Sequence, residues 1–222
     1  MTRPLVHSFS SLKQFDNCPK RYFHQRIEKS VKDEGGEAAV YGEVVHKALE
    51  ERVRDNKPLP PALAKHEEVC AKLVSIPDAE VHAEIEMVLT KDFTPTGWWS
   101  EDAWIRSKLD VLVIRGKSAL VGDYKTGKRR PDSFQLDLFA LQTFCHYPDV
   151  DVVNASFWWL KDDAVDSFKY KRAEVPRLKQ NMIYKTQRVE DALTYNNWPA
   201  RPSGLCPYCP CKDFCEFAVR RR

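Results

Sequence analysis

Residues 106–127, which read RSKLDVLVIRGKSALVGDYKTG, constrain the fold of this chain more than any other segment. Two apolar runs rich in β-branched residues flank the turn signal RGKS, a pattern typical of a β-hairpin. Pairing that is symmetric about Gly116 and Lys117 makes the numbers of partner residues sum to 233, which places Asp110 opposite Asp123. The hairpin is therefore predicted to bring two carboxylates together.

A lysine joins these carboxylates. Strand side chains alternate between faces, so Lys125 shares a face with Asp123 while Tyr124 points to the other. Like charges directly opposite each other repel, and a divalent cation between them would relieve that repulsion. The alternative is a solvated face with a Lys–Asp surface pair. The aligned Asp110, the apolar run up to Asp123 and the Thr-Gly after Lys125 favour the metal site.

These motifs resemble those of the PD-(D/E)xK nucleases of the RecB exonuclease type. DYKTG, which begins at Asp123, is similar to the family signature D-Y-K-T/S-G, and Asp110 stands where the family has a metal-binding aspartate on the preceding strand. Upstream, YGEVVHKALEE resembles the family's G-x-x-x-H helix, with Gly42 and His46 one turn apart.

Two further positions agree with the family in order and spacing. Glu84, in VHAEIEMVL, matches the acidic residue upstream of the hairpin, although Glu86 lies on the same face and is also a candidate. Gln135, in SFQLDLFALQTF, matches the glutamine of the Q-x-x-x-Y motif, which is incomplete because Phe139 stands where the tyrosine would be. Each residue alone is unspecific, but the ordered set indicates a nuclease.

The resemblance implies an α/β fold with a restriction-endonuclease-like core, in which helices flank a central mixed β-sheet. It implies a metal-dependent DNA exonuclease that acts in recombination, repair or end processing. The implied ligands of Mn²⁺ or Mg²⁺ are His46, Asp110, Asp123 and the carbonyl of Tyr124. The implied catalytic residues are Lys125, Asp123, Asp110, Glu84 and Gln135. A histidine ligand favours Mn²⁺ over Mg²⁺.

Seven cysteines form a second constellation. The odd count, and an N-terminal segment MTRPLVHSFSSLKQF without the apolar core of a signal peptide, argue for reduced thiols in a cytosol. Cys206-x2-Cys209-x5-Cys215 has the density of a thiolate metal site, which suits zinc or an iron–sulfur cluster. Because Cys211 completes a local set of four, a zinc knuckle remains an alternative.

The family resemblance extends to these cysteines. SFSSLKQFDNCPKRYF, residues 8–23, resembles a segment of iron–sulfur members such as the AddB-type recombination nucleases and the CRISPR adaptation nucleases. In those relatives one cysteine precedes the nuclease core and three follow it with C-x2-C-x5-C spacing. The resemblance implies a structural [4Fe-4S] cluster held by Cys18, Cys206, Cys209 and Cys215, which would join the two ends of the chain. Cys211 departs from the pattern.

The chain has 222 residues, 43% of them hydrophobic, which is enough for one domain with a proper core. We expect a single nuclease domain over 1–222, with its core at about 37–197 and a cysteine region at about 8–30 and 198–222. No run approaches the ~20 apolar residues of a membrane span, so we expect a cytoplasmic protein, bacterial or phage-encoded. The pattern predicts helices within 10–75 and at 133–146 and 176–196, and strands near 80–90, 103–114, 118–125, 152–160 and 165–172.

A net charge of +3 does not by itself indicate a DNA-binding protein. The distribution of charge says more, because the basic residues Lys128, Arg129 and Arg130 closely follow Lys125 and would suit a phosphate backbone. Three tryptophans, at positions 98, 99 and 104, are candidates either for stacking on unpaired bases or for the core.

The expected partner is DNA that is single-stranded or has free ends, together with recombination or helicase proteins. The alternative function is a zinc-containing DNA-binding or adaptor module of the same fold without cleavage activity. Such a module needs the cysteines but not the carboxylates of the hairpin. Cleavage polarity and oligomeric state stay open at the level of sequence.

Overall fold

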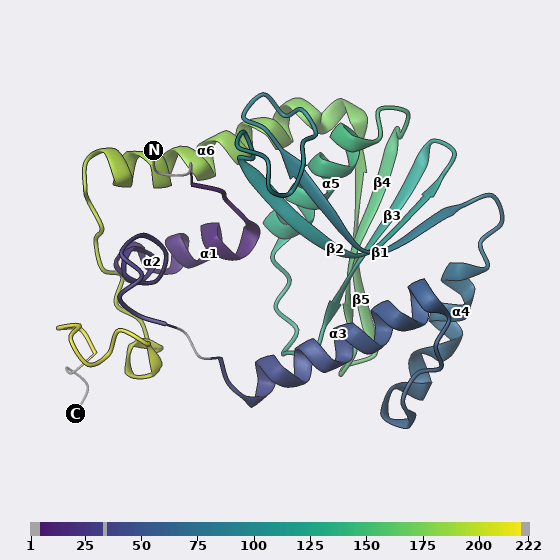
Figure 1. Ribbon diagram of the computed structural model, residues 1–222, viewed down its shortest axis with the longest axis horizontal. Coiled ribbons are helices and arrows are strands. Elements are labelled where there is room, and N and C mark those ends of the chain that lie inside the picture. The colour runs from purple at the N-terminus through teal and green to yellow at the C-terminus, as the bar shows by residue number, and fades with distance from the viewer. Residues whose placement is uncertain (1–4, 33–34, 219–222) are drawn as a thin grey trace. The chain divides into compact units, whose positions relative to one another are not determined.

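The computed structural model describes residues 5–32 and 35–218, and it divides into two compact units (Figure 1). Of the described residues, the sheet unit contains 5–6 and 36–180, and the cysteine unit contains 7–32, 35 and 181–218. The boundary falls within helix α6 (Val175–Thr194). The expectation of a single domain stays a prediction.

The sheet unit is built on five strands in the order β1-β2-β3-β4-β5. Only β3 and β4 run parallel, and helix α5 (Ser133–His146) connects them, while the other neighbours are antiparallel. This is the predicted mixed sheet, with strand bounds close to those expected from the sequence. The strands are β1 (Glu80–Leu89), β2 (Ile105–Arg115), β3 (Ser118–Lys125), β4 (Val152–Trp159) and β5 (Ala164–Lys171).

The hairpin of β2 and β3 has the predicted register. Arg115 pairs with Ser118 and Val111 with Gly122, so the numbers of partner residues sum to 233. Gly116 adopts a positive φ of 52° in the two-residue loop, where a residue without a Cβ is unstrained. The regular ladder ends at Val111, and Asp110 follows at the next position.

Helices cover both faces of the sheet. Helix α3 (Glu37–Asp55) buries Val45 and Leu49 in a cluster with Val111 of β2 and Tyr124 of β3. Asp123, the neighbour of Tyr124, contacts Gln135 of α5 instead. Because adjacent strand residues point to opposite faces, α3 and α5 lie on opposite sides of the sheet, as Figure 1 shows.

The cysteine unit combines segments from both ends of the chain. Its N-terminal part contains α1 (Phe9–Asn17), α2 (Pro19–Tyr22) and a π-helix (Phe23–Ile27). The Trp198 ring stacks on Tyr22, with centroids 6.1 Å apart, and lies 5.2 Å from the Phe23 ring. Asp16 forms ion pairs with Lys185 and Arg188 of α6. Aromatic packing and ion pairs thus hold the two segments together.

The remaining helices are short. They are α4 (Glu67–Val74) and the 3-10 helices Pro61–His66, Arg172–Glu174 and Cys206–Tyr208.

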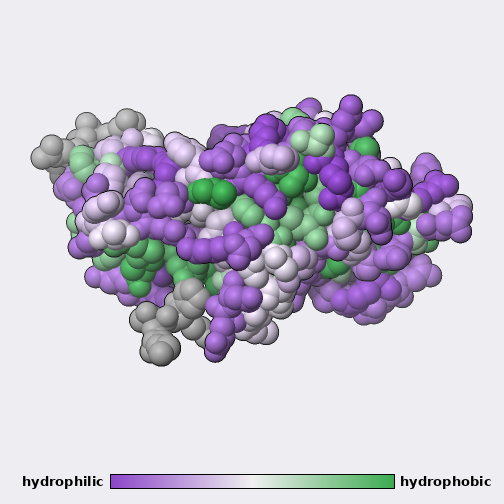
Figure 2. Space-filling view, turned by 90° about the horizontal axis from the view of Figure 1, so that it is seen from above, coloured by the Kyte–Doolittle hydropathy of each residue, from purple (hydrophilic) through white to green (hydrophobic). Residues whose placement is uncertain are grey.

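Hydrophilic residues cover most of the face shown in Figure 2, with smaller hydrophobic areas between them. In the part of the chain that the structure describes, no helix combines the length and the apolar character that crossing a membrane requires.

Candidate active site

Three side chains from three elements meet at one edge of the sheet unit. His46 comes from α3, Glu84 from β1 and Asp110 from β2, and one ligand atom from each lies within 4.8 Å of the others. His46 Nδ1 and Asp110 Oδ1 are 3.1 Å apart. All three residues line an open cleft of about 490 Å³. One nitrogen and two carboxylates beside an open cleft form a donor set that a divalent cation such as Mn²⁺ can use.

The Asp110 carboxylate is held at both oxygens. Oδ1 lies against His46, and Oδ2 accepts a 2.6 Å hydrogen bond from the backbone N–H of Tyr124. The carboxylate therefore spans the gap where β2 and β3 leave their regular ladder. The orientation of this candidate ligand is fixed before any cation binds.

Glu84 has an unusual backbone conformation for a strand residue. Its φ is +54°, and it interrupts the β1–β2 ladder between the pairs Ala83–Val111 and Ile85–Leu109. A non-glycine residue in this region costs roughly 1–3 kcal/mol and persists only where its surroundings enforce it. The sequence left Glu84 and Glu86 as alternatives. Glu84 joins the three-residue group, whereas Glu86 is exposed and paired with Lys108 in the ladder.

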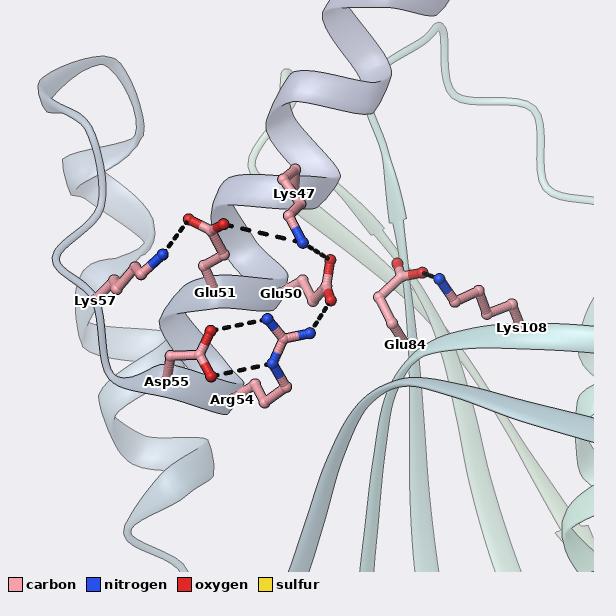
Figure 3. Close-up of polar contacts among 8 residues, drawn as sticks. All are labelled: Lys47, Glu50, Glu51, Arg54, Asp55, Lys57, Glu84 and Lys108. Carbon is pink, nitrogen blue, oxygen red and sulfur yellow. Dashed lines mark hydrogen bonds and ion pairs between the residues drawn. The ribbon is translucent and has the colours of Figure 1, made fainter.

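Lys108 provides the counter-charge to Glu84, and sequence reasoning did not single it out. Its Nζ lies 2.7 Å from Glu84 Oε2, as Figure 3 shows. Glu50 of α3 also lines the cleft, but its carboxylate is engaged by Lys47 at 3.0 Å and by Arg54. Of these two carboxylates, only Glu84 belongs to the group with His46 and Asp110.

Behind the cleft, Asp123, Lys125 and Gln135 form a closed ring of polar contacts. Lys125 Nζ lies 2.6 Å from Asp123 Oδ2 and donates to Gln135 Oε1 at 2.9 Å. Gln135 Nε2 donates to Asp123 Oδ1 at 2.8 Å. The shared face predicted for Asp123 and Lys125 is confirmed, and the predicted Gln135 reaches both of them from α5.

Burial and charge set the protonation of this site. Burial raises the pKa of Asp123 to about 6, the Lys125 ammonium opposes that rise, and the Asp110 charge adds to it. Burial by itself lowers the pKa of His46, but the hydrogen bond to Asp110 and the charges of Asp110, Asp123 and Glu84 raise it above its ordinary value. Without a cation the site therefore tends to retain protons, as expected where carboxylates gather.

The predicted ligand set is brought together in part. His46 and Asp110 lie together as predicted, and the backbone of Tyr124 reaches Asp110 through its N–H. Asp123 is engaged by Lys125 and Gln135, and Glu84, predicted as a catalytic residue, joins the group of candidate ligands. No sequence pattern signalled the positive φ of Glu84.

The predicted DNA-binding residues Lys128, Arg129 and Arg130 are exposed. Arg129 is bound to Asp166 of β5, with Nε 2.9 Å from Oδ2, so part of its charge is already compensated. Trp104 is a core residue that packs edge-on against Phe93, which removes it from the candidates for base stacking.

A second hollow, of about 740 Å³, lies in the cysteine unit and was not predicted. Among the described residues that line it there are several cations and no acidic side chain. Such a lining is suited to phosphate groups. The signal in the sequence is the recurrence of basic residues between positions 13 and 32, namely Lys13, Arg21, Arg26, Lys29 and Lys32.

The cysteines of the two chain ends lie in the same unit. Cys18 is the C-cap residue of α1 and the N-cap residue of α2. In the C-terminal segment, the backbone N–H of Cys215 donates to the Cys211 carbonyl at 3.1 Å. The hydrogen bond to Glu216 chiefly raises the pKa of Lys20, and the Cys215 and Cys18 sulfurs add to the effect.

Cys211 differs from the other cysteines of its segment because it is buried. Burial raises the pKa of its thiol to about 12, and the neighbouring Cys209 sulfur adds to the rise. Among the described residues, no three cysteine sulfurs lie within 4.8 Å of one another. The zinc knuckle, like the iron–sulfur cluster, therefore stays a prediction.

Comparison with known proteins gives a family and a fold. The model of the PD-(D/E)XK nuclease superfamily matches residues 7–216. The fold is similar to the crystal structure of SSO0001, with 16% identity and a TM-score of 0.50 over 99% of this chain and 90% of that one. A proposed exonuclease from Eubacterium rectale has 11% identity and a TM-score of 0.48, over 98% and 88% of the two chains. No curated protein sequence matches the chain.

Proposed function

Because the chain belongs to the PD-(D/E)XK nuclease superfamily, we propose that it is a divalent-metal-dependent exonuclease that hydrolyses DNA from free ends. The observation that carries this proposal is the meeting of His46, Glu84 and Asp110 beside the Asp123–Lys125 pair. An adaptor module of the same fold would have no need for these carboxylates. Their retention in one open cleft favours catalysis.

His46, Asp110 and Glu84 would hold the cation, Mn²⁺ or Mg²⁺, together with Asp123 and the carbonyl of Tyr124. Such an ion would supply Lewis-acid chemistry for the scissile phosphate and would make a water molecule at the site more acidic. The Tyr124 N–H keeps the Asp110 carboxylate in place for this task.

Lys125 is the side chain that acts on the attacking water or on the charge of the phosphate. Its ammonium is anchored between Asp123 and Gln135, with contacts of 2.6 and 2.9 Å. From there it orients the attacking water or stabilises the negative charge that develops on the phosphate. Gln135 fixes the Asp123 carboxylate, so that Lys125 and its partner keep one relative position.

The exonuclease assignment rests on the DYKTG and G-x-x-x-H motifs, which are similar to those of RecB-type enzymes. Recombination, repair and end processing are the settings in which such an activity is used. Lys128, Arg129 and Arg130 contribute positive charge to the approach of the DNA strand.

A [4Fe-4S] cluster held by Cys18, Cys206, Cys209 and Cys215 is the second part of this proposal. Support for it comes from the free thiols of all four residues and from their place in one compact unit of the chain. The cluster would join the N- and C-terminal segments and stabilise the unit, since closing a long loop restricts the unfolded chain. Redox chemistry is not required of it.

Product mapping tests the exonuclease proposal. Linear DNA labelled at the 5′ or the 3′ end, and circular single-stranded DNA, are incubated with the purified chain and Mn²⁺, with EDTA as the control. Mononucleotides or short products from linear DNA, with the circle intact, are expected. Rapid cutting of the circle would show an endonuclease, and no cleavage of any substrate would refute the function.

A further inference from the structure

The loop between β1 and β2 displays two adjacent tryptophans over an arginine. The Arg106 guanidinium lies 4.7 Å from the ring centroid of Trp98 and 5.9 Å from that of Trp99. Trp99 is 77% exposed, which is unusual for the largest apolar side chain. An indole held over a cation and open to solvent on its other side has a free π-face for a ligand.

The charge of Arg106 has no acidic partner in the described part of the chain. Among residues 5–32 and 35–218, no carboxylate forms an ion pair with this guanidinium. The nearby loop residue Asp102 accepts hydrogen bonds from Thr96 at 2.9 Å and Ser100 at 2.6 Å instead. The cation–π contacts orient Arg106 while its N–H groups remain available for an anionic ligand.

The loop that carries the tryptophans is ordered. The backbone N–H of Thr96 donates to the Val88 carbonyl at 3.1 Å, and that of Ser100 donates to the Gly97 carbonyl at 3.1 Å. Trp104, at the end of the loop, is buried against Phe93. Trp98 and Trp99 therefore project from a fixed turn, and little conformational entropy is lost when they bind a ligand.

Strand β2 connects this loop to the candidate active site. Arg106 and Lys108 are two residues apart in the regular part of β2, so they share a face at a spacing of about 6.8 Å. Lys108 in turn lies 2.7 Å from Glu84 of the candidate metal group. Arg106, Lys108 and Glu84 thus form a continuous polar track from the tryptophans to the cleft, all within the sheet unit.

We propose that Trp98, Trp99 and Arg106 form a binding subsite for an unpaired nucleotide of the DNA substrate. The base stacks on the exposed Trp99 indole, and Arg106 binds a neighbouring phosphate. Stacking on a protein ring requires a base released from its duplex partner, so the subsite selects a single-stranded segment near the scissile bond. The choice of DNA as the ligand rests on the proposed function.

Binding in EDTA tests the subsite without cleavage. Fluorescence anisotropy of a labelled single-stranded oligonucleotide is compared for the wild type, Trp99→Ala and Arg106→Gln. Tyr195→Ala, which removes another exposed ring of 76% exposure, is the matched control. Trp99→Ala is expected to weaken binding about 5- to 100-fold, and Tyr195→Ala to leave it unchanged. Equal affinities for wild type and Trp99→Ala would overturn the proposal.

Two further comparisons separate stacking from a general effect on the fold. Trp99→Phe keeps a ring and should retain most of the affinity that Trp99→Ala loses. An oligonucleotide with abasic positions should bind the wild type and Trp99→Ala with similar affinity, because it offers no base to stack. If Trp99→Ala weakens both oligonucleotides equally, the ring does not stack on a base and the subsite is refuted.

Hydrolysis of bis(p-nitrophenyl) phosphate with Mn²⁺ distinguishes this proposal from the proposed function. This small diester reaches the metal site but has no base, so Trp99→Ala should hydrolyse it at the wild-type rate. A wild type that binds single strands through Trp99 but hydrolyses neither the diester nor DNA would refute the nuclease and leave the subsite. Hydrolysis by the wild type, with unchanged oligonucleotide affinity in Trp99→Ala, would support the nuclease and refute the subsite.

Discussion

His46 and Asp110 are separated by 64 residues, yet their Nδ1 and Oδ1 atoms lie 3.1 Å apart. This contact joins α3 to β2 at the point where the hairpin ladder ends. Because Asp110 is buried, the cost of removing its charge from water offsets much of the attraction within the pair, whereas an imidazole fixed beside a carboxylate is a ready donor to a cation. The contact is therefore explained better by metal binding than by the stability of the fold.

Substitution of His46 tests its role as a ligand. His46→Ala is expected to lower the Mn²⁺-dependent cleavage rate at least tenfold and to shift the metal preference from Mn²⁺ toward Mg²⁺, because imidazole is a poorer partner for the harder ion. Metal titrations of the cleavage rate measure both effects, with His24→Ala as the control outside the site. An unchanged ratio of Mn²⁺ to Mg²⁺ activity would show that His46 does not bind the metal.

The buried Asp123 predicts a pH dependence of stability in the metal-free protein. Its pKa is raised from 3.8 to about 6, so the folded state binds this proton more tightly than the unfolded state does. The resulting stability is fully present below pH 3.8 and is lost as the pH rises through about 6. Asp123→Asn should therefore gain about 2 kcal/mol relative to the wild type between pH 4 and pH 7.

Urea denaturation in EDTA at several pH values measures this difference. Taking the variant relative to the wild type cancels the contributions of other titrating groups. If the difference in unfolding free energy is constant from pH 4 to pH 7, the pKa of Asp123 is not raised in the folded protein.

Gly122 is required for the packing of β3 against β4. A Cβ at this position would lie 3.0 Å from Cζ2 of Trp158, and the indole cannot give way without disturbing the Tyr124 ring against which it packs. Gly122→Ala should lower the free energy of unfolding by about 1–3 kcal/mol. Gly97→Ala, where a Cβ would meet nothing within 4 Å, is the control. Equal stability of the two variants would contradict this packing argument.

The cysteine assignment predicts different outcomes for two serine variants. Cys211→Ser should retain about four irons per chain and the visible absorption of a thiolate-bound cluster, since Cys211 is outside the proposed ligand set. Cys18→Ser should lose both and become less stable by several kcal/mol, by analogy with the ~4–5 kcal/mol of a long covalent loop. Anaerobic purification with iron and sulfide analysis decides between them. One zinc per chain that survives Cys18→Ser would instead identify a local zinc knuckle.

The local parts of the fold could be predicted from the sequence. The hairpin register followed from a turn signal between two apolar runs, and the shared face of Asp123 and Lys125 followed from strand alternation. Gln135 was implied by the resemblance to the family's Q-x-x-x-Y motif, and α5 brings it to both partners. Each of these relationships depends on short segments, for which periodicity is informative.

The long-range parts could not be predicted in the same way. Glu84 lies in one group with His46 and has a positive φ, a conformation that glutamate does not favour and that no motif signals. The ion pair between Lys108 and Glu84, and the cation–π contacts of Arg106, depend on side chains that converge only after the sheet has formed. Such contacts carry no fixed sequence spacing.

The most direct test of the central claim is the rate at which the purified chain degrades end-labelled linear DNA in Mn²⁺, compared with Lys125→Ala. Lys125 contacts Asp123 and Gln135 but belongs to no apolar cluster, so the variant should fold and bind Mn²⁺. Lys169→Ala, an exposed lysine of β5, is the control. The account predicts degradation by the wild type and the control and less than a tenth of that rate for Lys125→Ala. A rate above a tenth in a folded Lys125→Ala, or no degradation by the wild type, would contradict it.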